Sequence, residues 1–137
     1  MWVAYALLSA FFAALVAIFA KIGIKGVDSD LATAIRTVII LFIAWGIVFF
    51  KGSYSTMGSI TRHSWLFLVL SGAATGMSWL FYFRALQLGK VSQVAPIDKL
   101  SVALALILSY FILGEHMSLK ETIGALLVIA GTLVLAL

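Results

Sequence analysis

The chain has 137 residues, of which 64% are hydrophobic and only 10% are charged, and its mean hydropathy is +1.21. Soluble domains have about 25% charged residues, so this composition argues against a water-soluble fold. The absence of cysteine excludes disulfides and thiolate chemistry, and the net charge of +4 is spread along the chain rather than gathered into a basic patch for nucleic acid.

Five apolar segments are long enough to cross a bilayer. A hydrocarbon core about 30 Å thick requires about 20 residues of helix at a rise of about 1.5 Å per residue. The predicted helices cover residues 2–24, 31–50, 65–88, 91–113 and 119–137. The sequence therefore predicts an all-α polytopic membrane protein, with one five-span transmembrane domain over residues 1–137.

The first predicted helix follows Met1 directly, with neither a basic leader nor a cleavage signal before Lys21. We therefore expect it to remain in the mature protein as a span rather than to be removed as a signal peptide.

Polar residues near the starts of the later helices fit the N-cap position. Asp28 precedes the second helix and Ser92 lies at the start of the fourth. Before the fifth, Ser118 and Glu121 have the spacing of a capping box, in which each side chain accepts a hydrogen bond from the other residue's backbone N–H.

The positive charges leave the membrane orientation weakly specified. Five spans place the termini on opposite sides, and the loops on each side carry three Lys or Arg residues. These are Lys51, Arg62 and Lys120 on the N-terminal side, and Lys21, Lys25 and Lys90 on the other. The charges deeper in the helices tilt the count toward a cytoplasmic C-terminus.

Four ionisable residues lie inside the predicted helices, where a charge costs roughly 2.5 to 3.5 kcal/mol. Arg36 and Arg84 are close enough to helix ends to extend into the headgroup region, or they serve as charge partners within the protein. Asp98 and Lys99 lie deeper, roughly 9 to 10 Å into the fourth helix.

Adjacent residues on a helix point about 100° apart, so we expect Asp98 and Lys99 not to pair face to face. Asp98 then pairs with Arg84 or Arg36, or it faces water. Both a cavity-lining role and a purely structural ion pair remain open.

Pro96 favours a cavity beside the fourth helix. Proline leaves a carbonyl one turn earlier without its helical donor, which membranes tolerate where protein or water satisfies that carbonyl. Below it, Asp98 and Ser101 begin a polar track at helical spacing, continued by Ser109.

The third helix carries two neighbouring stripes of interest. Hydroxyl-bearing residues recur on one face, at Ser71, Thr75, Ser78 and Tyr82. The adjacent stripe contains Gly72, Gly76, Trp79 and Phe83. The GxxxG spacing of the two glycines is typical of close helix packing, as is the heptad spacing of Gly124 and Gly131 in the fifth helix. The hydroxyl stripe beside Trp79 suits a pocket for an amphipathic or aromatic solute.

Catalytic motifs are absent from the sequence. It contains no HExxH, GxSxG or phosphate-binding loop, and both histidines fall in predicted loops. We therefore predict neither an enzyme nor a bound metal or cofactor.

Several short segments after residue 81 form a recognisable pattern: Tyr82-Phe83-Arg84-Ala85-Leu86, Val94-Ala95-Pro96-Ile97, Gly114-Glu115, Gly124 and Gly131. On this pattern the chain resembles the EamA-type repeat of the drug/metabolite transporter superfamily. The resemblance covers nearly the whole chain and is densest from Tyr82 to Leu137. The resemblance implies half of a ten-span transporter, in which two inverted five-span halves surround a central cavity lined by the third and fourth helices of each half. It points to Trp79, Tyr82, Pro96 and Asp98 as cavity residues.

Because the chain holds one such half, the resemblance and the equal loop charges together suggest an antiparallel homodimer with copies inserted both ways. The chain resembles small multidrug transporters in this expected assembly, but it lacks the carboxylate that they carry in their first helix.

The favoured function is alternating-access transport of a small organic solute, such as a metabolite, amino acid or drug-like compound, across a prokaryotic inner membrane. Two alternatives remain open: a non-transporting membrane subunit that packs onto a partner protein, and one half of a heterodimeric transporter.

Overall fold

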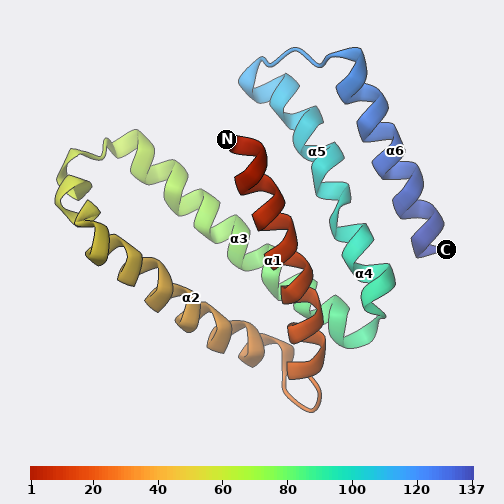
Figure 1. Cartoon of the computed structure of the whole chain (residues 1–137), viewed down its shortest axis with the longest axis horizontal. Coiled ribbons are helices and arrows are strands. Elements are labelled where there is room, and N and C mark those ends of the chain that lie inside the picture. The colour runs from red at the N-terminus through yellow and green to blue at the C-terminus, as the bar shows by residue number, and fades with distance from the viewer. The chain divides into compact units, whose positions relative to one another are not determined.

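The computed structural model describes residues 1–137, and every regular element in it is helical (Figure 1). The elements are α1 (Trp2–Gly23), α2 (Ser29–Lys51), η1 (Ser53–Ser59), α3 (Arg62–Leu88), α4 (Val91–Asp98), α5 (Leu100–Leu108), η2 (Ser109–Leu113) and α6 (Leu119–Ala136). Five helical segments are long and apolar enough to cross a membrane: α1, α2, α3, Val91–Leu113 and α6. The predicted all-α fold with five spans is confirmed.

Local sequence signals explain where α2 and α6 begin. Asp28 caps α2, because its Oδ1 accepts hydrogen bonds of 3.0 Å from the backbone N–H groups of Asp30 and Leu31. The predicted capping box of α6 is present, with Ser118 and Glu121 bonded to each other's backbone. The prediction for α4 is wrong: its N-cap is Lys90, with no side-chain hydrogen bond, and Ser92 lies inside the first turn.

Residues 22–87 form one compact unit, built from α2, η1 and α3. The two long helices run in opposite directions (Figure 1). Gly52 ends α2 at a φ of +70°, a left-handed conformation that a side chain would strain. At the other end of the hairpin, Gln87 Nε2 donates to the carbonyl oxygen of Val27 at 2.7 Å.

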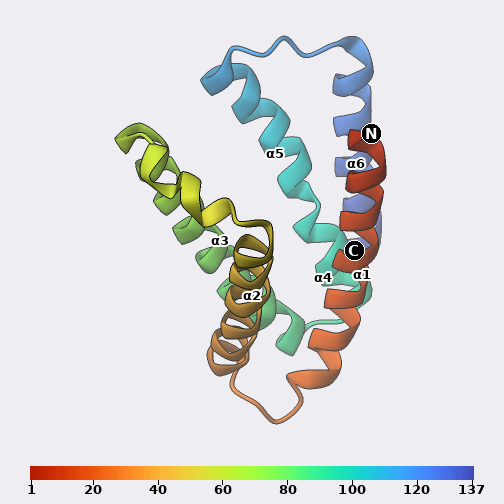
Figure 2. The same ribbon diagram turned by 60° about the vertical axis from the view of Figure 1, so that its left-hand side comes forward.

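A second unit contains residues 1–21 and 88–137. Lys21 Nζ, near the end of α1, donates to the carbonyl oxygen of Gly89 at 2.7 Å, which ties α1 to the loop before α4. Both α4 and α5 pack against α6. A loop leads from the α5 end of the fourth span to α6 (Figure 2).

The fourth span is interrupted where the sequence predicts one continuous helix. Lys99 separates α4 from α5, and its N–H bonds the carbonyl oxygen of Pro96, three residues earlier, at 3.0 Å. The same carbonyl oxygen accepts a 3.2 Å hydrogen bond from Thr132 Oγ1 on α6. Proline is a common cause of such breaks, and here the carbonyl oxygen of Pro96 itself also accepts a hydrogen bond from a neighbouring helix.

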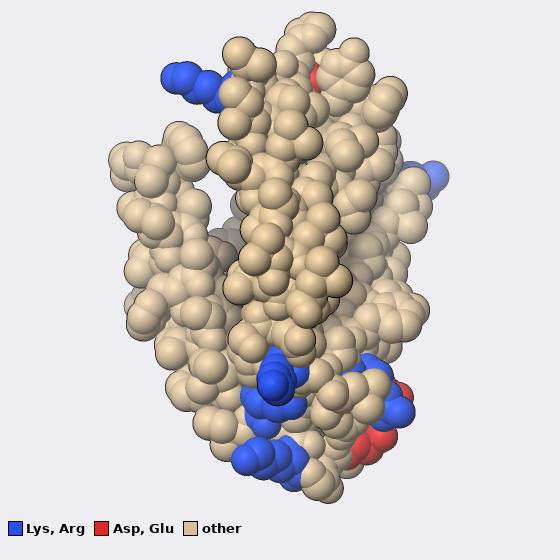
Figure 3. Space-filling model, turned by 90° about the vertical axis from the view of Figure 1, so that its right-hand side faces the viewer, with Lys and Arg blue, Asp and Glu red and all other residues tan.

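Little of the apolar surface is buried within the chain. Six hydrophobic side chains are buried, namely Ala17, Ala20, Ile24, Phe83, Leu86 and Ala103, whereas most large apolar residues are exposed. On the face drawn in Figure 3, uncharged atoms cover the middle of the helices and charged groups gather at helix ends. A helix that is apolar all round is typical of membrane spans.

Candidate functional site

A cleft of about 460 Å³ lies between α2 and α3. Its lining residues are Thr37, Ile40, Leu41 and Ala44 from α2, and Leu68, Ser71, Gly72, Thr75, Gly76 and Trp79 from α3. These positions avoid both ends of each helix. The cleft therefore occupies the middle of the two spans, and its lining combines hydroxyl groups, an indole ring and apolar side chains.

Two of the four residues in the predicted hydroxyl stripe line this cleft. Ser71 and Thr75 do so, whereas Ser78 is exposed outside it and Tyr82 packs edge-on against Phe83, with ring centroids 5.6 Å apart. Thr75 Oγ1 donates to the carbonyl oxygen of Ser71 at 2.9 Å. The Thr75 hydroxyl thus keeps its oxygen lone pairs available to accept a hydrogen bond from a solute.

The glycines of the neighbouring stripe open the cleft rather than bring helices together. Within this unit, a Cβ atom added to Gly72 or Gly76 would meet no atom within 4 Å. The same holds for Gly124 and Gly131 on α6. Close packing of these glycines against a helix of another chain stays a prediction.

The side chain of Arg36 lies against α3 rather than extending into the headgroup region. Its guanidinium carbon is 4.1 Å from the ring centroid of Phe83 and 5.6 Å from that of Trp79. The Nη1 atom is buried and has no hydrogen-bond partner. The two aromatic rings therefore hold the cation, while one of its donors stays unsatisfied.

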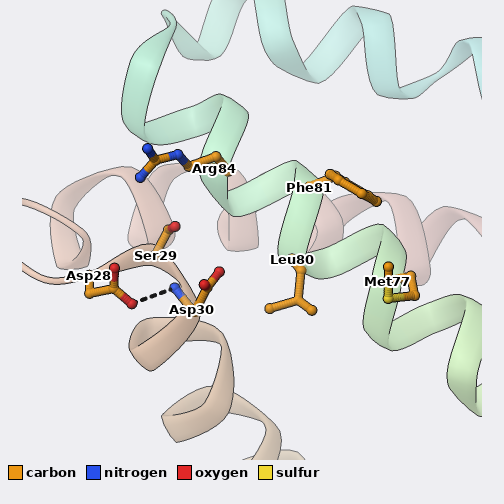
Figure 4. A pocket seen from close by; sticks show the side chains of 7 residues that line it. All are labelled: Asp28, Ser29, Asp30, Met77, Leu80, Phe81 and Arg84. Atoms are coloured by element: carbon orange, nitrogen blue, oxygen red, sulfur yellow. Dashed lines mark hydrogen bonds between the residues drawn. The ribbon is translucent and has the colours of Figure 1, made fainter.

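A second cavity, of about 520 Å³, lies near the start of α2 (Figure 4). Asp28, Ser29 and Asp30 line it from α2, and Met77, Leu80, Phe81 and Arg84 from α3. Asp28 already accepts the first N–H groups of the helix, and Arg84 Nη1 donates to Gln87 Oε1 at 3.2 Å. Asp28 and Arg84 therefore already have partners within the protein.

Asp98 and Lys99 form an ion pair, with 3.3 Å between Lys99 Nζ and Asp98 Oδ2, so the expectation that they do not pair is wrong. Lys99 lies between α4 and α5 with a right-handed helical backbone, and its long, flexible side chain reaches the neighbouring carboxylate. These two residues, with Pro96 and Ser101, belong to the unit of residues 1–21 and 88–137. Pairing of Asp98 with Arg36 or Arg84, which belong to the other unit, stays a prediction.

Sequence reasoning missed the α2 wall of the cleft. Its lining residues, Thr37, Ile40, Leu41 and Ala44, recur at the spacing of one helix face. A usable signal was the series Ser29, Thr33 and Thr37, in which each threonine hydroxyl donates to the carbonyl oxygen four residues earlier, at 2.9 and 2.8 Å. Thr132 was also missed, because nothing local marks it as the partner of Pro96.

Comparison with known proteins agrees with this architecture. The model of the EamA-like transporter family matches residues 1–137. A protein from a Sinorhizobium species, described as an uncharacterized transporter in the cobO 3′ region, is 50% identical over 135 residues, which cover 98% of this chain and 96% of that protein. No solved structure matches the chain at a significant level. The chain therefore belongs to the EamA-like transporter family, and this membership and the relative's name point to a multi-pass membrane transporter rather than an enzyme.

Proposed function

We propose that this protein moves a small organic solute across the membrane by alternating access, and that the solute binds in the α2–α3 cleft. The observation that carries the proposal is the position of the cleft at mid-span, since secondary transporters bind their substrates near the bilayer midplane. Its volume of about 460 Å³ suits a metabolite, an amino acid or a drug-like compound.

The cleft's lining supports an amphipathic or aromatic solute. Thr37 and Thr75 use their hydroxyl protons on backbone carbonyls, so each presents an oxygen that accepts from a solute N–H or O–H group. The indole ring of Trp79 offers a flat surface for an apolar or aromatic body.

We further propose that two copies assemble as an antiparallel homodimer, with α4 and its residues Pro96, Asp98 and Ser101 contributing to a shared central cavity. The relative is of similar length, since the aligned region covers 96% of it. In many transporters alternating access is a rocking of two inverted halves against each other, and a second copy inserted the other way supplies the second half. The origin of the relative in a Sinorhizobium species supports a prokaryotic inner membrane as the location of this protein.

Filling the cleft tests its role in transport. Purified protein in liposomes is assayed for flux of labelled amino acids and aromatic compounds, using the wild type, Gly76→Leu and the control Gly46→Leu. A Cβ at either glycine meets no atom within 4 Å, so there is room for the first side-chain carbon at both positions. Gly46 lies on α2 outside the cleft lining.

We expect Gly76→Leu to reduce flux at least tenfold and Gly46→Leu to retain it. Equal flux in the two variants would contradict the assignment of the cleft. A wild-type protein that moves none of these compounds, yet copurifies with another membrane protein, would instead favour the partner-subunit alternative.

A further inference from the structure

Arg36, on α2, contacts two aromatic rings of α3, one of which lines the cleft. Thr37, the next residue on α2, lines the cleft, and so does Trp79, whose ring contacts the Arg36 guanidinium. The second ring that contacts this guanidinium, that of Phe83, is buried, with 1% of its surface exposed. The two rings fix the position of the cation beside the cleft.

The stacking leaves part of the guanidinium's hydrogen-bonding capacity unused. An arginine carries five N–H donors at the edge of its plane, whereas cation–π contacts use its faces. Nη1 is buried without an acceptor. A buried charged donor without an acceptor raises the free energy of the protein in a membrane. An oxygen acceptor that reaches Nη1 removes this cost, which favours its binding.

The carboxylates within residues 22–87 do not supply an acceptor for Arg36 Nη1. Asp28 and Asp30 lie at the start of α2, where Asp28 caps the helix. Arg36 is roughly 9 Å further along the helix than Asp30, at about 1.5 Å per residue. Arginine favours planar oxyanions, which it binds with two parallel hydrogen bonds.

We propose that Arg36 binds the anionic group of the transported solute, so that the substrates are small organic acids with an apolar or aromatic body. The oxyanion lies against the guanidinium edge, and the body of the solute extends into the cleft along Trp79 and Thr75. This inference rests on the proposed function and names its substrate class.

Equilibrium binding in detergent tests the inference without requiring transport. The dissociation constants of three acids are compared with those of their neutral amides by calorimetry: benzoate with benzamide, indole-3-acetate with indole-3-acetamide, and butyrate with butyramide. The proteins are the wild type, Arg36→Gln, Arg36→Lys and the control Arg62→Gln, which removes an exposed arginine at the start of α3.

We expect the wild type to bind at least one acid roughly tenfold to hundredfold more tightly than its amide, as expected for a charged hydrogen bond. Arg36→Gln should bring the two constants together, Arg36→Lys should retain part of the difference, and Arg62→Gln should retain all of it. A wild type that prefers no acid, or a preference that survives in Arg36→Gln, overturns the proposal.

Two further measurements test whether the anionic group that binds Arg36 belongs to a lipid or to Asp98 rather than to a solute. If phosphatidylglycerol, but not phosphatidylcholine, raises the melting temperature through Arg36 and the acids do not compete, the ligand is a lipid headgroup and the solute assignment falls. If Arg36→Gln and Asp98→Asn lower the melting temperature non-additively, Asp98 is the acceptor and the assignment also falls.

Failure of this inference and failure of the proposed function give different results. Flux of a neutral amide without any preference for acids leaves transport standing and removes only the role of Arg36. Binding of an acid through Arg36 without flux leaves the role of Arg36 standing and contradicts the proposed transport.

Discussion

The hydroxyl group of Thr132 donates a hydrogen bond to the carbonyl oxygen of Pro96, 3.2 Å away and 36 residues earlier in the chain. Thr132 is buried, with 4% of its surface exposed, in the apolar C-terminal half of α6. The bond joins α6 to the interrupted fourth span at the break itself. The break is therefore held by a tertiary contact, in addition to the turn formed by Lys99.

Replacing Thr132 with valine removes this hydrogen bond and nearly preserves the shape of the side chain. We expect a loss of roughly 1 kcal/mol in the free energy of unfolding, since hydrogen bonds between membrane helices average about 0.6 and reach about 1.7 kcal/mol. Unfolding by SDS in mixed micelles measures it. The control is Thr122→Val on the same helix, because Thr122 donates only to its own helix at Ser118 and should change stability little.

Phe83→Leu tests the aromatic support of Arg36. Leucine fills most of the volume but lacks the ring face, so we expect a loss of roughly 1 to 2 kcal/mol through the cation–π contact and imperfect packing. Thermal unfolding in detergent compares it with Phe81→Leu, in which an exposed ring is replaced. Equal stability of the two variants would mean that the 4.1 Å contact contributes nothing measurable.

Asp98→Asn removes the charge that pairs with Lys99 and keeps the size of the side chain. If Asp98 lines the transport cavity, flux in liposomes should fall at least tenfold while the dimer recovered from a sizing column is unchanged. Glu115→Gln, in the exposed loop before α6, is the control and should transport normally. Parallel loss of dimer and flux would assign Asp98 a structural role.

The equal loop charges predict insertion in both orientations. A reporter fused to the C-terminus should then be active on both sides of the membrane. Lys120→Gln removes a positive charge from the N-terminal side and should move the reporter toward the cytoplasm. Lys90→Gln removes one from the opposite side and should move the reporter outward. A reporter found on one side for the unmodified chain would exclude the antiparallel homodimer.

Local features of this protein follow from its sequence alone. Length and hydropathy are enough to predict five membrane spans, because each span needs only about 20 apolar residues. The caps at Asp28 and at Ser118 with Glu121 are equally local, since their partners lie within three residues. The two stripes on α3 could also be predicted from the sequence, because helical periodicity shows which residues share a face.

The tertiary structure decided which neighbour each face meets. In a membrane, lipid and protein are both apolar, so periodicity does not show whether a stripe faces lipid, a helix or a cleft. α2 and α3 run in opposite directions in one hairpin, and this arrangement decides the neighbours of both faces. The stripe of Gly72, Gly76 and Trp79 lines a cleft next to α2. Arg36 of α2 contacts the ring of Phe83 of α3. The bond from Thr132 to Pro96 joins residues 36 apart in the chain, and only packing brings such partners together.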